Sequence, residues 1–109
     1  MHELAVTQSV VDAVSERVGG ARVRTVRLDI GPLSGVVPDA VRFCFDVVAA
    51  GTPLEGAALD ITQTAGCGRC RDCGRETELT DLIVLCPCGS ADVAVTGGRD
   101  LRIESVEVV

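Results

Sequence analysis

The sequence has very few aromatic side chains. It contains no Trp and no Tyr, and its two aromatic residues are Phe43 and Phe45. Its hydrophobic core must therefore consist mainly of Val, Leu, Ile and Ala, with these two rings as the only large side chains. The shortage of aromatic rings also removes the stacking surfaces on which many single-strand nucleic-acid binders depend.

The sequence has fewer basic than acidic residues, and it has no long apolar run. The formal net charge is −6 and the pI is about 4.6, so the chain repels a phosphate backbone. No stretch approaches the roughly 20 apolar residues that span a bilayer, and the first residues lack the charge and apolar pattern of a signal peptide. We therefore expect a cytoplasmic protein that binds neither nucleic acid nor membrane.

The spacing of apolar residues predicts an α+β fold with two helices and a small sheet of about three strands. Helical spacing occurs in residues 4–18, with a stripe of Leu4, Val10, Val11, Val14 and Val18, and from Pro38 onward, with a stripe of Val41, Cys44, Phe45 and Val48. Strand-like alternation occurs in residues 22–30, 58–64 and 101–109. The alternation is interrupted before Val26, which predicts a β-bulge or a late strand start, and again near Ser105.

Five of the six cysteines lie between the last two of these strands. This segment has little apolar content apart from residues 82–85, and a segment so short needs a cross-link to fold. Because thiols stay reduced in the cytosol, metal binding is favoured over disulfides. The chain is therefore predicted to have a body, residues 1–66 and 99–109, and an inserted zinc-ribbon-like domain, residues 67–98.

The cysteines of the insert form two close pairs, Cys70 with Cys73 and Cys86 with Cys88. A glycine follows each pair, which permits the turn that directs backbone N–H groups at sulfur. Two such pairs supply four thiolates, the tetrahedral ligand set of a structural zinc ion. An iron–sulfur cluster uses the same ligands, but nothing else in the sequence suggests an electron partner.

One further cysteine leaves the choice of ligands open. Cys67 and Cys70 also have pair spacing, so Cys67 could replace Cys73 or Cys88. Unligated, reduced cysteines are the simpler alternative. Cys44 lies on a predicted helical stripe and is expected to be a small core residue.

The single histidine of the chain is its second residue. The Met1 amine, the His2 amide nitrogen and the His2 imidazole can close two adjacent chelate rings, a donor set that suits Ni²⁺ or Cu²⁺. Glu3 could bind the ion, position a water molecule or orient the imidazole. From spacing alone, a solvated histidine and a Glu3 that stabilises the first helical turn explain the same residues.

Several stretches together resemble one known family. In order and spacing, MHE, LDIGPLSGVVPDAVRFCFDVV, CGRCRDCG, CPCGS and LRIESVEV resemble the HypA/HybF family of hydrogenase nickel-incorporation proteins. The resemblance covers essentially the whole chain. One departure is that Cys86-Pro87-Cys88 is one residue shorter than the C-P-x-C common in the family, which keeps Cys67 in consideration as a ligand.

The resemblance implies a metallochaperone and not an enzyme. It implies transferable Ni(II) at Met1, His2 and Glu3, and structural Zn(II) at Cys70, Cys73, Cys86 and Cys88. It implies two partners, a HypB-type nickel GTPase and the large subunit of [NiFe]-hydrogenase, although some relatives serve urease. A homodimer is compatible with the sequence.

Other functions remain as alternatives. A zinc-ribbon protein-interaction module without nickel transfer would explain the cysteines alone. A thiol oxidoreductase would use one C-x-x-C pair with a lowered thiol pKa. A hydrolytic zinc enzyme is disfavoured, because the only histidine lies far from the cysteines along the chain and a catalytic zinc site usually includes one.

Overall fold

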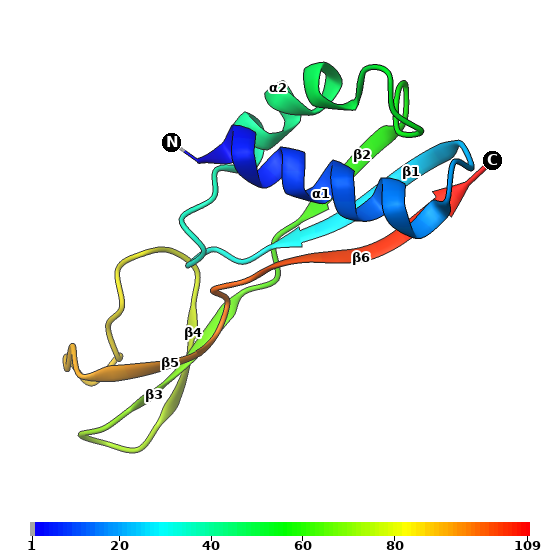
Figure 1. Ribbon diagram of the computed structural model, residues 1–109. Coiled ribbons are helices and arrows are strands. Elements are labelled where there is room, and N and C mark those ends of the chain that lie inside the picture. Colours follow the sequence, from blue (N-terminus) through cyan, green and yellow to red (C-terminus); the bar gives the residue numbers. More distant parts are fainter. Residues whose placement is uncertain (1) are drawn as a thin grey trace.

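The computed structural model describes residues 2–109 and has two helices and two three-stranded sheets (Figure 1). The elements in chain order are α1 (Glu3–Val18), β1 (Val23–Ile30), α2 (Pro38–Ala49), β2 (Ala58–Thr62), β3 (Gly66–Cys70), β4 (Glu76–Leu79), β5 (Val93–Gly97) and β6 (Leu101–Val108). The molecule is elongated, with extents of 51 × 24 × 17 Å. The predicted α+β class is confirmed. Within residues 2–109, neither helix is both long enough and apolar enough to cross a bilayer.

The body contains the sheet β2-β1-β6, with both helices on one face (Figure 1). β1 is parallel to β2 and antiparallel to β6. Parallel neighbours need a crossover connection, and α2 provides it. The register of β1 against β6 shifts between Arg27, which faces Ser105, and Leu28, which faces Ile103. Glu104 is therefore a bulged residue, which explains the interrupted alternation near Ser105.

The core of the body lies between this sheet and the helices. Its fully buried side chains include Val11 and Val14 of α1, Val26 and Leu28 of β1, and Val41 of α2. Gly19 ends α1 in the left-handed conformation, and its N–H donates to the Ser15 carbonyl at 3.2 Å, as expected for a glycine helix stop.

Two residues expected in the core are exposed instead, so those predictions are wrong. The Phe43 side chain is 83% exposed, whereas Phe45 is buried. Two residues correspond to about 200° around a helix, so the two rings point in opposite directions. Leu4 is 59% exposed, whereas Thr7, about one turn later on α1, is fully buried. The Thr7 hydroxyl donates to the Glu3 carbonyl at 2.6 Å, which satisfies it inside the core.

The two phenylalanines provide a matched test of this core. Phe45→Ala should lower the free energy of unfolding by about 3–5 kcal/mol, the usual cost of emptying a buried aromatic site. Phe43→Ala removes the same ring from a solvent-exposed position and should change the free energy of unfolding by about 0.5 kcal/mol or less. Urea unfolding followed by circular dichroism measures both. Equal effects would show that α2 packs with another face toward the sheet.

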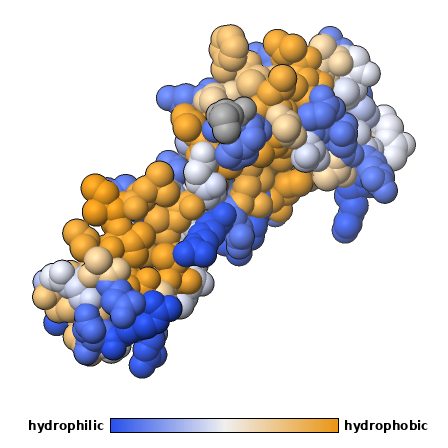
Figure 2. All heavy atoms as spheres, turned by 60° about the vertical axis from the view of Figure 1, so that its left-hand side comes forward, coloured by the Kyte–Doolittle hydropathy of each residue, from blue (hydrophilic) through white to orange (hydrophobic). Residues whose placement is uncertain are grey.

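The insert forms the second sheet, in the order β4-β3-β5. Its own core is small and consists of Cys70, Cys86 and Val93, with Val84 packed against them. Of the apolar run at residues 82–85, Leu82 is 69% exposed and Ile83 is 70% exposed. Figure 2 accordingly shows apolar surface on the insert as well as on the body. So little buried apolar area cannot hold three short strands together without a cross-link.

The two sheets meet where the chain enters and leaves the insert. A Cβ added to Gly31 would lie 2.2 Å from the Gly98 carbonyl oxygen, and one added to Gly98 would lie 2.5 Å from the Gly66 Cα. These segments therefore cross in direct backbone contact, which only glycine permits. The buried Asp29 carboxylate accepts the Thr64 N–H at 2.9 Å beside this crossing, and that hydrogen bond lowers the pKa of Asp29. We propose that the boundaries of the 67–98 insert lie at this crossing.

Candidate metal centres

Four of the predicted zinc ligands lie together at the end of the insert. The sulfur atoms of Cys70, Cys73, Cys86 and Cys88 all lie within 4.8 Å of one another. The Cys70 and Cys88 sulfurs are 3.7 Å apart, and those of Cys73 and Cys86 are 3.6 Å apart. A tetrahedron with Zn–S bonds of ~2.3 Å has sulfur–sulfur edges of about 3.8 Å. The donor set therefore fits a tetrahedral zinc ion.

The two cysteine pairs are held by the same kind of turn. In the first, the Cys70 N–H donates to the Arg75 carbonyl and the Gly74 N–H donates to the Cys70 carbonyl, each at 2.9 Å. In the second, the Cys86 N–H donates to the Ser90 carbonyl at 2.9 Å and the Gly89 N–H donates to the Cys86 carbonyl at 2.8 Å. The second turn is the first one tightened by one residue. This explains how the short Cys86-Pro87-Cys88 sequence still presents two sulfurs to one point.

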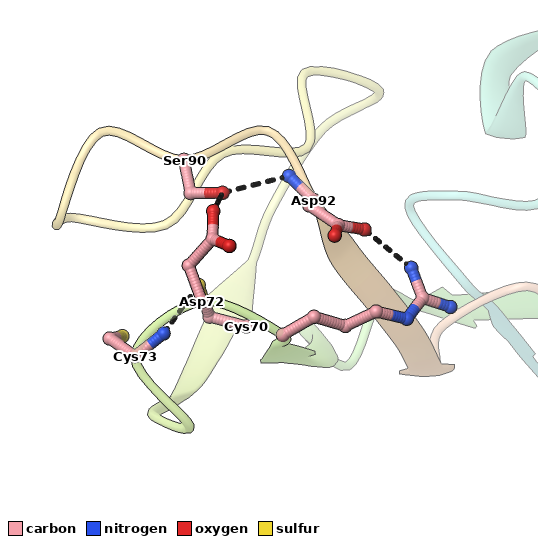
Figure 3. A network of polar contacts seen from close by, with 6 residues as sticks. Cys70, Asp72, Cys73, Ser90 and Asp92 are labelled. Carbon is pink, nitrogen blue, oxygen red and sulfur yellow. Dashed lines mark hydrogen bonds and ion pairs between the residues drawn. The ribbon is translucent and has the colours of Figure 1, made fainter.

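Polar contacts join the two turns to each other (Figure 3). The Ser90 hydroxyl donates to the Asp72 carboxylate, and the Asp92 N–H donates to the same hydroxyl oxygen at 3.0 Å. Arg71 forms an ion pair with Asp92 at 2.7 Å. Asp72 and Arg71 belong to the first turn, Ser90 closes the second turn, and Asp92 lies two residues after Ser90. The network therefore fixes the spacing of the cysteine pairs.

The surroundings of Cys70 and Cys86 shift the pKa values of their thiols in opposite directions. The hydrogen bond from the Cys73 backbone N–H lowers the pKa of the Cys70 thiol to about 6. The Cys88 backbone N–H acts in the same direction on Cys86, but burial and the neighbouring thiols outweigh it and raise the pKa of Cys86 to about 12. Of these two thiols, Cys70 therefore loses its proton more readily, and a bound metal ion would favour ionisation of both.

The other two cysteines lie outside this cluster. Cys67 is exposed, and its sulfur accepts a hydrogen bond from the Thr96 hydroxyl at 3.4 Å. It is three residues before Cys70 on β3, and an odd separation on a strand places two side chains on opposite faces. The structure therefore offers no support for Cys67 as a substitute ligand. Cys44 is half-buried on α2.

Two of the three predicted nickel ligands, His2 and Glu3, lie at the start of α1, far from the four-cysteine cluster (Figure 1). Met1 is outside the residues that the structure describes. His2 is exposed and occupies the N-cap position of α1 without a side-chain capping bond. Glu3 is buried, and its Oε2 accepts the backbone N–H of Val37 at 3.2 Å. The carboxylate is thus held by the body, while the neighbouring imidazole faces solvent.

No local pattern in the sequence predicts the contact between Glu3 and Val37. One signal was present: Val37 is the N-cap residue of α2, and the third helical residue, Ala40, has no side-chain acceptor for the Val37 N–H, unlike the Glu or Gln of a capping box. Glu3, 34 positions earlier in the chain, supplies this acceptor instead. The same segment also reaches the insert, because the Leu33 N–H donates to the Gly98 carbonyl at 2.8 Å. We call residues 31–37 the connecting segment, since it contacts both the insert and the start of α1.

Glu3 can be tested for this anchoring role. Glu3→Ala should lower the midpoint of thermal unfolding, because it leaves the Val37 N–H without its side-chain acceptor. Glu3→Gln keeps a carbonyl oxygen there and should lower the midpoint less. Circular dichroism melts of both variants measure the difference. A Glu3→Ala protein as stable as the parent would show that this contact does not hold α2.

Known proteins share this arrangement over its whole length. The family model described as "Hydrogenase/urease nickel incorporation, metallochaperone, hypA" matches residues 1–108. The hydrogenase maturation factor HypA of Geotalea uraniireducens is 48% identical over 109 residues, covering 99% of each chain. That of Nostoc punctiforme is 46% identical over 108 residues, covering 99% of this chain and 96% of the relative.

Solved structures agree with these sequence matches. The solution structure of the Ni metallochaperone HypA from Helicobacter pylori superposes with a TM-score of 0.69 at 26% identity, covering 100% of this chain and 98% of the other. The match includes both the body and the insert. On the whole-length family match and these relatives, the chain belongs to the HypA family of metallochaperones, which are nickel-incorporation proteins and not enzymes.

Proposed function

We propose that this chain binds Ni(II) through Met1, His2 and Glu3 and helps insert it into [NiFe]-hydrogenase during maturation. Zinc on Cys70, Cys73, Cys86 and Cys88 would remain as a permanent cross-link of the insert. The relatives at 46–48% identity are named as hydrogenase maturation factors, which supports hydrogenase as the recipient.

The observation that carries the nickel proposal is the contrast between two neighbouring side chains. His2 is exposed, while Glu3 is buried and held by the Val37 N–H. One donor is therefore fixed to a rigid body, and the other is open to solvent. Nitrogen donors at the start of the chain favour Ni²⁺ over harder ions such as Mg²⁺. Such a site can hold an ion and still admit a ligand from a partner protein.

Release follows from the same exposure. An acceptor can contribute its first ligand to nickel before the last donor of this chain leaves, so the ion never becomes free. Protons compete for the imidazole and the amine, so nickel affinity should fall as the pH falls. We propose a HypB-type nickel GTPase and the large subunit of [NiFe]-hydrogenase as partners, in the cytoplasm. The resemblance of the chain to its family supports both partners.

The zinc site would serve architecture in this proposal. When bound, zinc supplies a four-way cross-link that the small apolar core of the insert does not provide. Two of the four sulfurs, those of Cys70 and Cys86, belong to buried residues. A buried, fully coordinated ion exchanges slowly, whereas an ion at an exposed chain terminus exchanges readily. The two sites are therefore suited to opposite tasks.

A single residue added before Met1 tests the proposed chelate. Extending the chain by one Gly removes the free amine from Met1 but leaves every side chain unchanged. We expect Ni(II) affinity to fall by about 100-fold or more, because the chelate loses a direct donor, and zinc content to stay at one per chain. Calorimetric titration with Ni(II) and elemental analysis measure both. Unchanged nickel affinity would refute the terminal chelate, while loss of zinc as well would point to misfolding.

A further inference from the structure

The most apolar stretch of the insert is exposed to solvent. Leu82 is 69% exposed, Ile83 is 70% exposed and Leu85 is 51% exposed. Single exposed apolar residues are common on proteins, but three within four positions form a patch, and such patches mark binding surfaces. The insert has very little apolar core of its own, so burial of these side chains would stabilise it directly. We call these three residues the apolar loop, and folding does not explain their exposure.

The apolar loop has a fixed backbone. Before it, Leu79 of β4 is buried, and the Asp81 carboxylate accepts the Ile83 N–H at 2.8 Å. In the middle, Val84 points inward and packs against the core of the insert. After it comes the proposed zinc ligand Cys86, which belongs to that same core. The outward side chains are therefore presented from an anchored segment, and the zinc site is one of its anchors.

The apolar loop lies on the same side of the molecule as the start of α1. In Figure 1 it belongs to the yellow segment that follows β4, on the left of the view, and α1 also begins on the left. Figure 2 brings this side forward and shows apolar surface over the insert, with the body above it. The molecule is 51 Å long, so a partner that touches both the insert and the start of α1 must have the size of a protein.

The charges around the apolar loop indicate the chemistry of this partner. No Lys or Arg occurs from residue 76 to residue 98, whereas Glu76, Glu78 and Asp81 come shortly before the loop. The whole chain has a net charge of −6. Such a surface repels nucleic acid and anionic lipid. It is complementary to an apolar recess bordered by Lys and Arg side chains on another protein.

We propose that the apolar loop is the docking surface for the protein that accepts nickel, the nickel-free precursor of the [NiFe]-hydrogenase large subunit. This inference rests on the proposed function, which supplies the identity of the acceptor. Docking on the insert leaves the start of α1 free for the nickel ligands of the acceptor. It also makes transfer a step within one complex, which raises the effective concentration of those ligands at the nickel site. The insert is then a docking arm, and zinc fixes the position of its loop.

A double variant, Leu82→Ser with Ile83→Ser, removes the docking surface and leaves both proposed metal sites in place. The nickel-free variant should bind the nickel-free precursor at least about tenfold more weakly than the parent, because loss of apolar side chains from the centre of an interface has effects of this size. Its Ni(II) affinity and zinc content should equal those of the parent. Biolayer interferometry on immobilised precursor measures docking, and calorimetry and elemental analysis measure the two metals.

Matched variants separate docking from folding and from nickel binding. Phe43→Ala with Val47→Ser removes an equally exposed apolar pair from α2, where Phe43 is 83% and Val47 is 74% exposed. This variant should bind the precursor as the parent does. His2→Ala should lose nickel and still bind the precursor. Leu82→Met with Ile83→Leu keeps the loop apolar and should restore docking to within about threefold of the parent.

Asp81→Asn tests the charge of the surface. The amide oxygen of Asn can still accept the Ile83 N–H, so the loop keeps its turn while the negative charge is lost. Docking should weaken by about two- to fivefold at roughly 20 mM salt, and the difference from the parent should disappear at roughly 500 mM, because salt screens exposed charges. The same interferometry measures both conditions. Equal docking by Asp81→Asn and the parent at low salt would overturn the charge complementarity by which this partner was chosen.

Three further results would overturn the proposal. The first is a parent protein that does not bind the precursor at concentrations up to about 100 µM. The second is loss of docking from the α2 variant and not from the loop variant, which would place the acceptor on α2. The third is a loop variant that loses binding only to the nickel GTPase or to phospholipid vesicles, either of which would be a different occupant. Docking is measured without nickel, so a failure of the terminal chelate leaves this test unaffected.

Discussion

His2→Ala should abolish high-affinity nickel binding and leave one zinc ion per chain. The imidazole is the only side-chain nitrogen donor of its kind in the sequence. Loss of supporting groups around a metal ligand already costs 10–100-fold in affinity, so loss of the ligand itself should cost at least about 100-fold. Nickel titration followed by calorimetry and elemental analysis of the untagged protein measures this result.

The fold should tolerate this change, which makes the result interpretable. His2 is exposed and makes no side-chain capping bond to α1, so its removal should not alter the unfolding midpoint. Leu4→Ala is the matched control, because Leu4 is 59% exposed on the same turn and carries no donor. It should bind nickel as the parent does. If the His2→Ala protein still binds Ni(II) with parental affinity, the carrier function proposed for this terminus is wrong.

Cys86→Ser should remove the zinc and unfold the insert. Structural zinc sites contribute on the order of 10 kcal/mol to folding, whereas the apolar core of the insert consists of little more than Cys70, Cys86 and Val93. We expect zinc content to fall from one per chain to near zero, with the backbone amides of β3, β4 and β5 losing their protection from hydrogen exchange. The body has a separate core and should stay folded.

Cys67→Ser is the matched control for the zinc site. Cys67 is exposed and bonded to Thr96, outside the four-sulfur cluster, so this variant should retain one zinc and a protected insert. Loss of zinc from Cys67→Ser, with zinc retained by Cys86→Ser, would reverse the assignment of ligands.

The zinc-free variant also tests whether the two metal sites are coupled. The connecting segment, residues 31–37, hydrogen-bonds to Gly98 through Leu33 and to Glu3 through Val37. Unfolding of the insert removes the first of these contacts and should loosen the second. We therefore expect Cys86→Ser to weaken nickel binding, although less than His2→Ala does. Parental nickel affinity in Cys86→Ser would show that the sites act independently.

The two helices and the three strands of the body could be predicted from the sequence because each depends on a local pattern, whereas the strands of the insert, β3, β4 and β5, were not predicted. Apolar spacing predicted both helices and the three strands of the body, and the slip near Ser105 corresponds to the bulge at Glu104. The spacing of the cysteines, with a glycine after each pair, predicted the four that the structure brings together. These signals all act within a few residues of one another, so no knowledge of tertiary contacts was needed.

The tertiary structure decided which sides of these elements are used and which distant residues meet. Phe43 is apolar, but the orientation of α2 on the sheet exposes it, and the pleat of β3 turns Cys67 away from the sulfur cluster. The contact of Glu3 with Val37 joins residues 34 positions apart, and the crossing of Gly31, Gly66 and Gly98 joins three separate segments. Local sequence determines periodicity, and periodicity determines the elements. The partners of each element depend on packing between segments far apart in the chain, because that packing alone settles which faces are buried.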